Sequence, residues 1–157
     1  MHKNKVQLPT DALVAVTYSC NAKCIMCNIW KERPQNELKP EEFAKLPASL
    51  KDINITGGEP FLRTDLPDIV QNITDKNPKV RLVISSNGFL TDRIVNFMNE
   101  IRKINRFSCI ALSLDGIGEM HDEIRGINNA YDKVIRTITG LKKSGFNDIR
   151  IGYTASK

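Results

Sequence analysis

Five short runs rich in β-branched and aliphatic residues recur along the chain, at intervals that leave room for a helix between them. They cover residues 12–18, 52–56, 80–85, 107–114 and 148–154, and their starts lie 40, 28, 27 and 41 residues apart. Successive parallel strands need a connection of about a dozen residues or more, usually a helix. The run at residues 13–16 is continuously apolar, which is typical of strands covered on both faces. The spacing therefore predicts an α/β fold with one parallel sheet.

Helical patterns fill the gaps between these runs. Apolar residues at helical spacing over residues 94–104 predict a helix with Thr91 as its N-cap. A similar pattern at 134–141 predicts another helix, which Gly145 can end in the left-handed conformation. Asp65 and Pro40 mark two earlier helix starts.

Length and charge narrow the class of protein. The 157 residues, 41% hydrophobic and 26% charged, are typical of one globular domain, too short for an eight-fold barrel of about 250 residues. The chain stops just after the fifth apolar run, so we expect it to be part of a longer protein.

The net charge of +5 comes from basic residues interspersed with acidic ones, which favours a solvated surface over a nucleic-acid partner. No apolar run approaches the roughly 18 residues of a membrane span, and no apolar segment follows the basic residues 1–5. A cytoplasmic protein is expected.

Three of the four cysteines, Cys20, Cys24 and Cys27, lie just after the first predicted strand. Clustered thiols in a cytoplasmic protein indicate a metal site. A cysteine-ligated iron–sulfur cluster takes four thiolates, so three leave one iron open, and an open position is typical of a catalytic site. A structural zinc with a fourth ligand from elsewhere, such as His2 or His121, is the alternative.

A glycine pair, a carboxylate and a proline follow the second predicted strand as Gly57, Gly58, Glu59 and Pro60. Glycines lack a Cβ atom, so their backbone groups can approach a ligand closely. The Glu59 carboxylate can accept a charge-assisted hydrogen bond from an ammonium group, while Pro60 fixes the turn. The alternative is a simple turn at the end of a strand.

Two further polar residues follow the fourth predicted strand. Ser113 lies at its end, and Arg125 follows in the next loop. A guanidinium group can bind a carboxylate with two hydrogen bonds, so Arg125 is a candidate anion contact. The alternative is a surface ion pair with Asp122 or Glu123. The fourth cysteine, Cys109, is expected to be a small buried hydrophobic residue.

Residues 20–27, CNAKCIMC, match the CxxxCxxC signature of radical S-adenosylmethionine (radical SAM) enzymes, and residues 57–60 resemble the GGEP motif of that family. The resemblance covers essentially the whole chain, including the polar segments 85–88 and 113–116. One position departs from the family pattern, because Met26 stands where an aromatic residue is common.

This resemblance implies a partial (β/α)6 TIM-like barrel of which about five βα units are present, with residues 1–157 forming the radical SAM core. It also implies a [4Fe-4S] cluster on the three clustered cysteines, whose open iron binds S-adenosylmethionine. Reductive cleavage of that nucleoside would give a 5′-deoxyadenosyl radical that abstracts hydrogen from a substrate. The implied contacts to S-adenosylmethionine are Met26, Gly57, Gly58, Glu59, Pro60, Ser85, Asn87, Ser113 and Arg125.

The expected partners are a small-molecule or peptide substrate and a reductant such as flavodoxin or ferredoxin, without nucleic acid or membrane. An ordinary turn is the alternative interpretation for Asp115 and for the Asn87-Gly88 pair. His121 is expected to lie on a loop. Two other functions remain open: an iron–sulfur electron carrier that does not cleave S-adenosylmethionine, and a basic zinc protein that binds nucleic acid.

Overall fold

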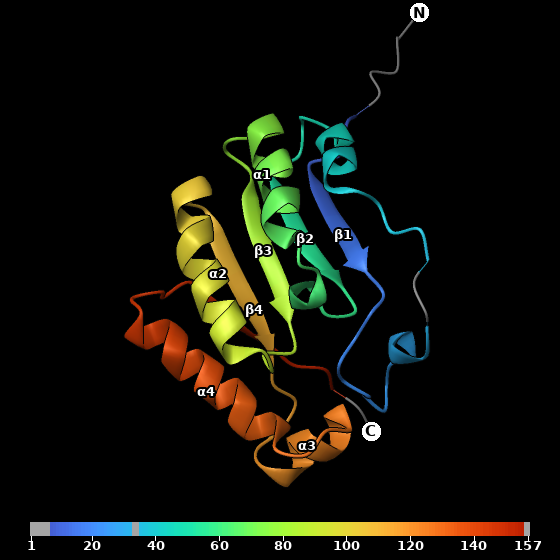
Figure 1. Ribbon diagram of the computed structural model, residues 1–157, viewed down its shortest axis with the longest axis vertical. Coiled ribbons are helices and arrows are strands. Elements are labelled where there is room, and N and C mark those ends of the chain that lie inside the picture. The colour runs from blue at the N-terminus through green and yellow to red at the C-terminus, as the bar shows by residue number, and fades with distance from the viewer. Residues whose placement is uncertain (1–6, 33–34, 156–157) are drawn as a thin grey trace, which may run out of the picture.

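The computed structural model describes residues 7–32 and 35–155 and contains one sheet with its helices (Figure 1). The elements, in chain order, are β1 (Asp11–Thr17), η1 (Ile29–Lys31), η2 (Pro40–Lys45), β2 (Asp52–Gly57), η3 (Pro60–Leu62), α1 (Leu66–Lys76), β3 (Arg81–Ser86), α2 (Thr91–Ile104), β4 (Ser108–Ser113), α3 (Glu119–Arg125), α4 (Ala130–Lys143) and β5 (Ile149–Gly152). The η elements are 3-10 helices. No helix within the described ranges has both the length and the apolar character of a membrane span.

The five strands form one parallel sheet in the order β1-β2-β3-β4-β5. Each strand overlaps one of the five apolar runs, so the predicted parallel α/β fold is confirmed. Because all strands run the same way, their carboxyl ends share one edge of the sheet. This edge is where ligands bind in folds of this class, and it carries the loops described below.

The hydrophobic core lies between one face of the sheet and helices α1, α2 and α4, which cover that face (Figure 1). Alternate residues of the central strands point into it, so Ile53 and Ile55, Leu82 and Ile84 are fully buried. Helices α1 and α2 contribute apolar side chains at helical spacing from the sides that pack against the sheet. This packing holds the carboxyl edge of the sheet in a rigid frame.

The opposite face of the sheet is open among the described residues, and it is mostly polar. Leu13 on β1 is 72% exposed, which contradicts the expectation that the apolar run at 13–16 is covered on both faces. The reason is that the helices all pack on one side and the five strands do not close on themselves. We call this uncovered surface the inner face, because it is the side that a closed barrel would enclose.

Three local expectations are corrected by the structure. Thr91 is the first residue of α2 rather than its N-cap, which is Leu90; its hydroxyl instead lies 2.7 Å from that of Thr137 on α4. The helix that begins at Pro40 is a short 3-10 helix. The segment after β4, predicted as a loop, contains helix α3, which ends at Arg125.

Candidate cofactor site

The three clustered cysteines lie on the loop between β1 and η1, at the carboxyl edge of the sheet. Cys24 is buried, whereas Cys20 and Cys27 are half-buried. Burial raises the pKa of the Cys20 thiol, and the charges of Glu59, Cys24 and Cys27 raise it further. Cys24 and Cys27 thus both act on the Cys20 thiol from the same loop.

The glycine pair after β2 lies directly against the start of this cysteine loop. A Cβ atom on Gly57 would come within 2.1 Å of the Thr17 carbonyl oxygen, and one on Gly58 within 2.1 Å of the Ser19 carbonyl oxygen. The amide of Gly58 donates to the Thr17 carbonyl over 2.7 Å. The sequence indicated that these glycines permit a close approach; the group that approaches them in the structure is the chain itself.

Glu59 is completely buried, and its carboxylate accepts three hydrogen bonds from the chain. The donors are the amide of Phe61 at 3.2 Å, the hydroxyl of Ser86 at 2.9 Å and the amide of Asn87 at 2.7 Å. Burial raises the pKa of Glu59 to about 7, although these donors oppose the shift. A carboxylate has about four acceptor positions, so one remains for an external donor.

Asn87 connects the end of β3 with the cysteine loop. Its side-chain amide donates to Asn21 over 2.6 Å, between Cys20 and Cys24 in sequence. Asn21 was not among the predicted site residues, and an isolated asparagine in a loop carries no signal that would have identified it.

Helix α3 holds the other side of the cysteine loop. The amides of Lys23 and Ile25 donate to the carbonyls of Arg125 and Ile124, each over 2.9 Å. Gly126, which follows the helix with φ of +64°, allows this contact, since a Cβ there would lie 2.4 Å from the Lys23 carbonyl oxygen. The loop is thus docked onto the last turn of a helix that sequence patterns did not predict.

Arg125 points into the site and not toward the surface. One guanidinium nitrogen lies 2.5 Å from the Asp115 carboxylate, and the other terminal nitrogen lies 3.6 Å from the Cys24 sulfur. The predicted alternative, a surface ion pair with Asp122 or Glu123, is wrong, because Arg125 is only 9% exposed and pairs with a buried carboxylate. Its Nε atom is buried and has no hydrogen-bond partner among the described protein atoms.

Asp115 and His121 support Arg125, and both are fully buried or nearly so. The Asp115 amide donates to His121 Nδ1 over 3.1 Å, and the amide of Thr154 donates to the Asp115 carboxylate. Burial lowers the pKa of His121, with a further contribution from Arg125. His121 was expected on a loop, whereas it lies buried in α3, a position that only the fold brings about.

Of the remaining predicted contacts, Ser113 and Ser85 lie on strands and Met26 lies on the cysteine loop. Ser113 is the last residue of β4 and is half-buried at the carboxyl edge. Ser85 lies on β3, where its hydroxyl donates to Asn54 over 2.8 Å. Met26 is 39% exposed on the cysteine loop. Cys109 is fully buried on β4, as expected, and the Arg81 guanidinium lies 3.8 Å from its sulfur.

The donor set fits an iron–sulfur cluster. Cysteine thiolates are the usual ligands of such clusters, and each cysteine binds a different iron. Within the described part of the chain, no three His, Cys, Asp or Glu side chains are grouped closely enough for a single metal ion, but a four-iron cluster does not require its ligands to meet around one ion. Of the two candidate zinc ligands, His2 lies outside the described residues. His121 accepts a hydrogen bond from the Asp115 amide at Nδ1, and its buried Nε2 has no partner among the described protein atoms.

The fold and the site together define an α/β domain of parallel strands that carries a three-cysteine loop at the carboxyl edge of its sheet. The chain belongs to the radical SAM superfamily, whose family model matches residues 14–155. The resemblance seen in the cysteine and GGEP motifs is thereby confirmed.

Curated relatives match along nearly the whole chain. An Fe-coproporphyrin III synthase of Methanosarcina barkeri is 32% identical over 149 residues, which is 90% of this chain and 36% of the relative. A probable GTP 3′,8-cyclase of Sulfurisphaera tokodaii is 29% identical over 153 residues, 94% of this chain and 47% of the relative. The chain thus spans between about a third and a half of these relatives.

Solved structures share the fold at lower sequence identity. Streptococcus suis SuiB bound to its precursor peptide SuiA aligns with a TM-score of 0.76 and 19% identity, over 95% of this chain and 34% of that one. The enzyme anSMEcpe with bound AdoMet aligns with a TM-score of 0.70 and 20% identity, over 92% of this chain and 43% of that one. These likenesses support the partial barrel architecture.

Proposed function

We propose that this chain binds a [4Fe-4S] cluster through Cys20, Cys24 and Cys27 and cleaves S-adenosylmethionine reductively. The observation that carries the proposal is the docking of the cysteine loop. Its backbone is hydrogen-bonded both to the segment at Gly57–Pro60 and to the end of α3, and these segments carry the predicted contacts to S-adenosylmethionine. When bound, the cluster and the nucleoside supply one-electron cleavage of the sulfonium carbon–sulfur bond, giving the 5′-deoxyadenosyl radical.

The residues around the cysteine loop provide complementary groups for a zwitterionic ligand. Arg125 offers a buried Nε–H without a partner, which suits a carboxylate. Glu59 retains one acceptor position, which suits an ammonium group. Ser113 and Asn87 add polar groups at the same edge of the sheet, and Met26 offers a soft apolar surface for an adenine ring.

For the substrate and the reductant we propose a chemical class, and for the protein a cellular location. A small molecule or a peptide is proposed as substrate; SuiB, which shares the fold, is known in complex with a precursor peptide. A low-potential protein such as flavodoxin or ferredoxin is proposed as reductant, and the cytoplasm as location.

Anaerobic reconstitution with iron and sulfide, followed by dithionite and S-adenosylmethionine, tests the proposal. We expect about four irons per chain and release of 5′-deoxyadenosine. Cys24→Ala should lose the cluster and the product, whereas Cys109→Ala, which changes a buried cysteine away from the loop, should retain both. A cluster without 5′-deoxyadenosine would indicate an electron carrier, and stoichiometric zinc without visible absorbance would indicate a zinc protein.

The role of Arg125 has a separate test. Arg125→Lys keeps a positive charge beside Asp115 but removes the Nε–H and the planar guanidinium. We expect binding of S-adenosylmethionine to weaken by roughly 1.5–3 kcal/mol, as for loss of a charge-assisted hydrogen bond. Equilibrium binding to the reconstituted chain measures this change. Unchanged affinity, with the iron content intact, would remove Arg125 from the set of contacts.

A further inference from the structure

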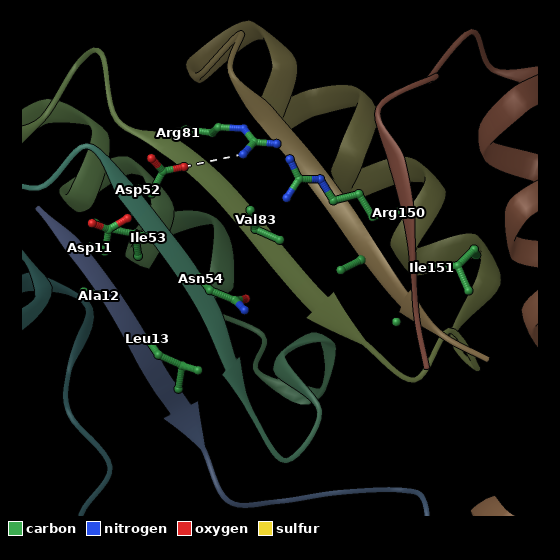
Figure 2. Close-up of a pocket in the computed structure, with 12 residues that line it drawn as sticks. Asp11, Ala12, Leu13, Asp52, Ile53, Asn54, Arg81, Val83, Arg150 and Ile151 are labelled. Carbon is green, nitrogen blue, oxygen red and sulfur yellow. Dashed lines mark ion pairs between the residues drawn. The ribbon is translucent and has the colours of Figure 1, made fainter. Parts of the chain in front are cut away.

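The inner face of the sheet contains a cavity of about 550 Å³, lined mainly by residues from the amino-terminal halves of β1, β2 and β3 (Figure 2). Four strands, β1, β2, β3 and β5, contribute long or charged side chains to the cavity lining. Strand β4 contributes only the small side chain of Ala111, so the cavity is deepest over β4. The cysteine loop does not line this cavity; its one link to the predicted contacts is Asn54, which accepts the hydrogen bond from Ser85.

Charge is divided across the cavity. Asp11 on β1 and Asp52 on β2 make one side acidic, while Arg81 on β3 and Arg150 on β5 make the other side basic (Figure 2). Arg81 is held by Asp52 over 3.5 Å. Arg150 forms no ion pair with any residue in the described part of the chain. The acidic side repels an anion, so a bound anion is directed to the basic side.

The two arginines extend toward one another above β4, from strands on either side of it (Figure 2). Two guanidinium groups that converge without an anion between them repel each other, and a bound carboxylate or phosphate relieves this repulsion. Guanidinium groups also match the geometry of these anions with paired hydrogen bonds. Arg81 already has a carboxylate partner in Asp52, whereas Arg150 has none in the described part of the chain, so the basic side has room for one further anion at Arg150.

Register gives the depth of this site below the carboxyl edge. Arg150 pairs with Ala111, two residues before Ser113, which is about 7 Å at 3.3 Å per residue. Arg81 lies five residues before Ser86, which is about 16 Å. A ligand whose anionic group contacts both arginines thus extends roughly 7–16 Å to reach the edge where the radical is proposed to form.

We propose that the cavity binds the carboxylate or phosphate group of the substrate, with Arg150 as the specificity-determining contact. That the ligand is the substrate rests on the proposed function, whereas anion binding itself does not. The acidic side formed by Asp11 and Asp52 orients the ligand by excluding its anionic group from β1 and β2.

Isothermal titration calorimetry of the reconstituted full chain with inorganic phosphate, and separately with succinate, tests this inference at constant ionic strength. We expect saturable binding of at least one anion. Arg150→Gln should weaken that binding at least tenfold, while Arg136→Gln, which removes the same charge from the exposed surface of α4, should change it less than twofold. Binding of phosphate alone would identify a phosphate ester, and binding of succinate alone a carboxylate.

Two results would overturn the inference: neither anion binds saturably, or Arg150→Gln binds as tightly as the parent chain. Formation of 5′-deoxyadenosine from S-adenosylmethionine, measured on the same samples without substrate, separates the two proposals. Product without anion binding removes the cavity site alone. Anion binding without product removes the radical function and leaves an anion site.

Discussion

Replacing Gly126 with alanine tests whether the end of α3 holds the cysteine loop in place. Gly126 and Gly145 both have left-handed backbones, with φ of +64° and +80°. A Cβ at Gly126 would lie 2.4 Å from the Lys23 carbonyl oxygen, whereas a Cβ at Gly145 meets no atom within 4 Å. Gly145→Ala is therefore a matched control for the conformational strain.

The difference between the two variants follows from the contacts. Left-handed strain costs each alanine about 1–2 kcal/mol. Gly126→Ala must also displace the cysteine loop, which removes the hydrogen bonds from Lys23 and Ile25 to α3. At about 1 kcal/mol for each bond, we expect Gly126→Ala to be less stable than Gly145→Ala by about 2 kcal/mol.

Two measurements check this expectation. Urea unfolding gives the free energy of unfolding of each variant, and iron analysis after anaerobic reconstitution reports the state of the cysteine loop. We expect Gly145→Ala to retain the parent chain's iron and Gly126→Ala to lose most of it. Equal stabilities together with equal iron contents would refute the role assigned to α3.

Two further predictions concern buried charge. Burial raises the pKa of Glu59 from 4.5 to about 7, so the folded chain holds this proton more tightly than the unfolded chain. The protonated carboxyl makes its full contribution to the free energy of unfolding below pH 4.5. This contribution, about 3 kcal/mol, is lost as the pH rises to 7. Urea unfolding of Glu59→Gln should lack this decline, and a parent chain equally stable at pH 5 and 8 would contradict it. Arg63→Met removes hydrogen bonds to two backbone carbonyls and an ion pair with Asp65, so thermal unfolding should show a loss of about 2–4 kcal/mol. Lys103→Met, which breaks an exposed ion pair, should cost less than about 1 kcal/mol, and equal losses would argue against a structural role for Arg63.

The sequence predicted the strands well because their signal is local. A run of β-branched residues favours a strand through its own composition, independently of distant contacts. For this reason β2 and β3 begin within a residue of the predicted runs. The cysteine loop and the glycine pair were also located correctly, since each follows directly on a strand and parallel strands share their carboxyl edge. Helix α3 was missed because it is only seven residues long and ends on a polar, charged turn.

The sequence by itself determined the class of this protein: alternating strands and helices, three thiols in a family-specific spacing, and a GGEP segment one unit later. Only the tertiary structure decided how these parts meet. The pairing of Arg125 with Asp115, the burial of His121 and the convergence of Arg81 with Arg150 join residues that are distant along the chain. Such contacts depend on strand register and helix packing, which no local pattern encodes.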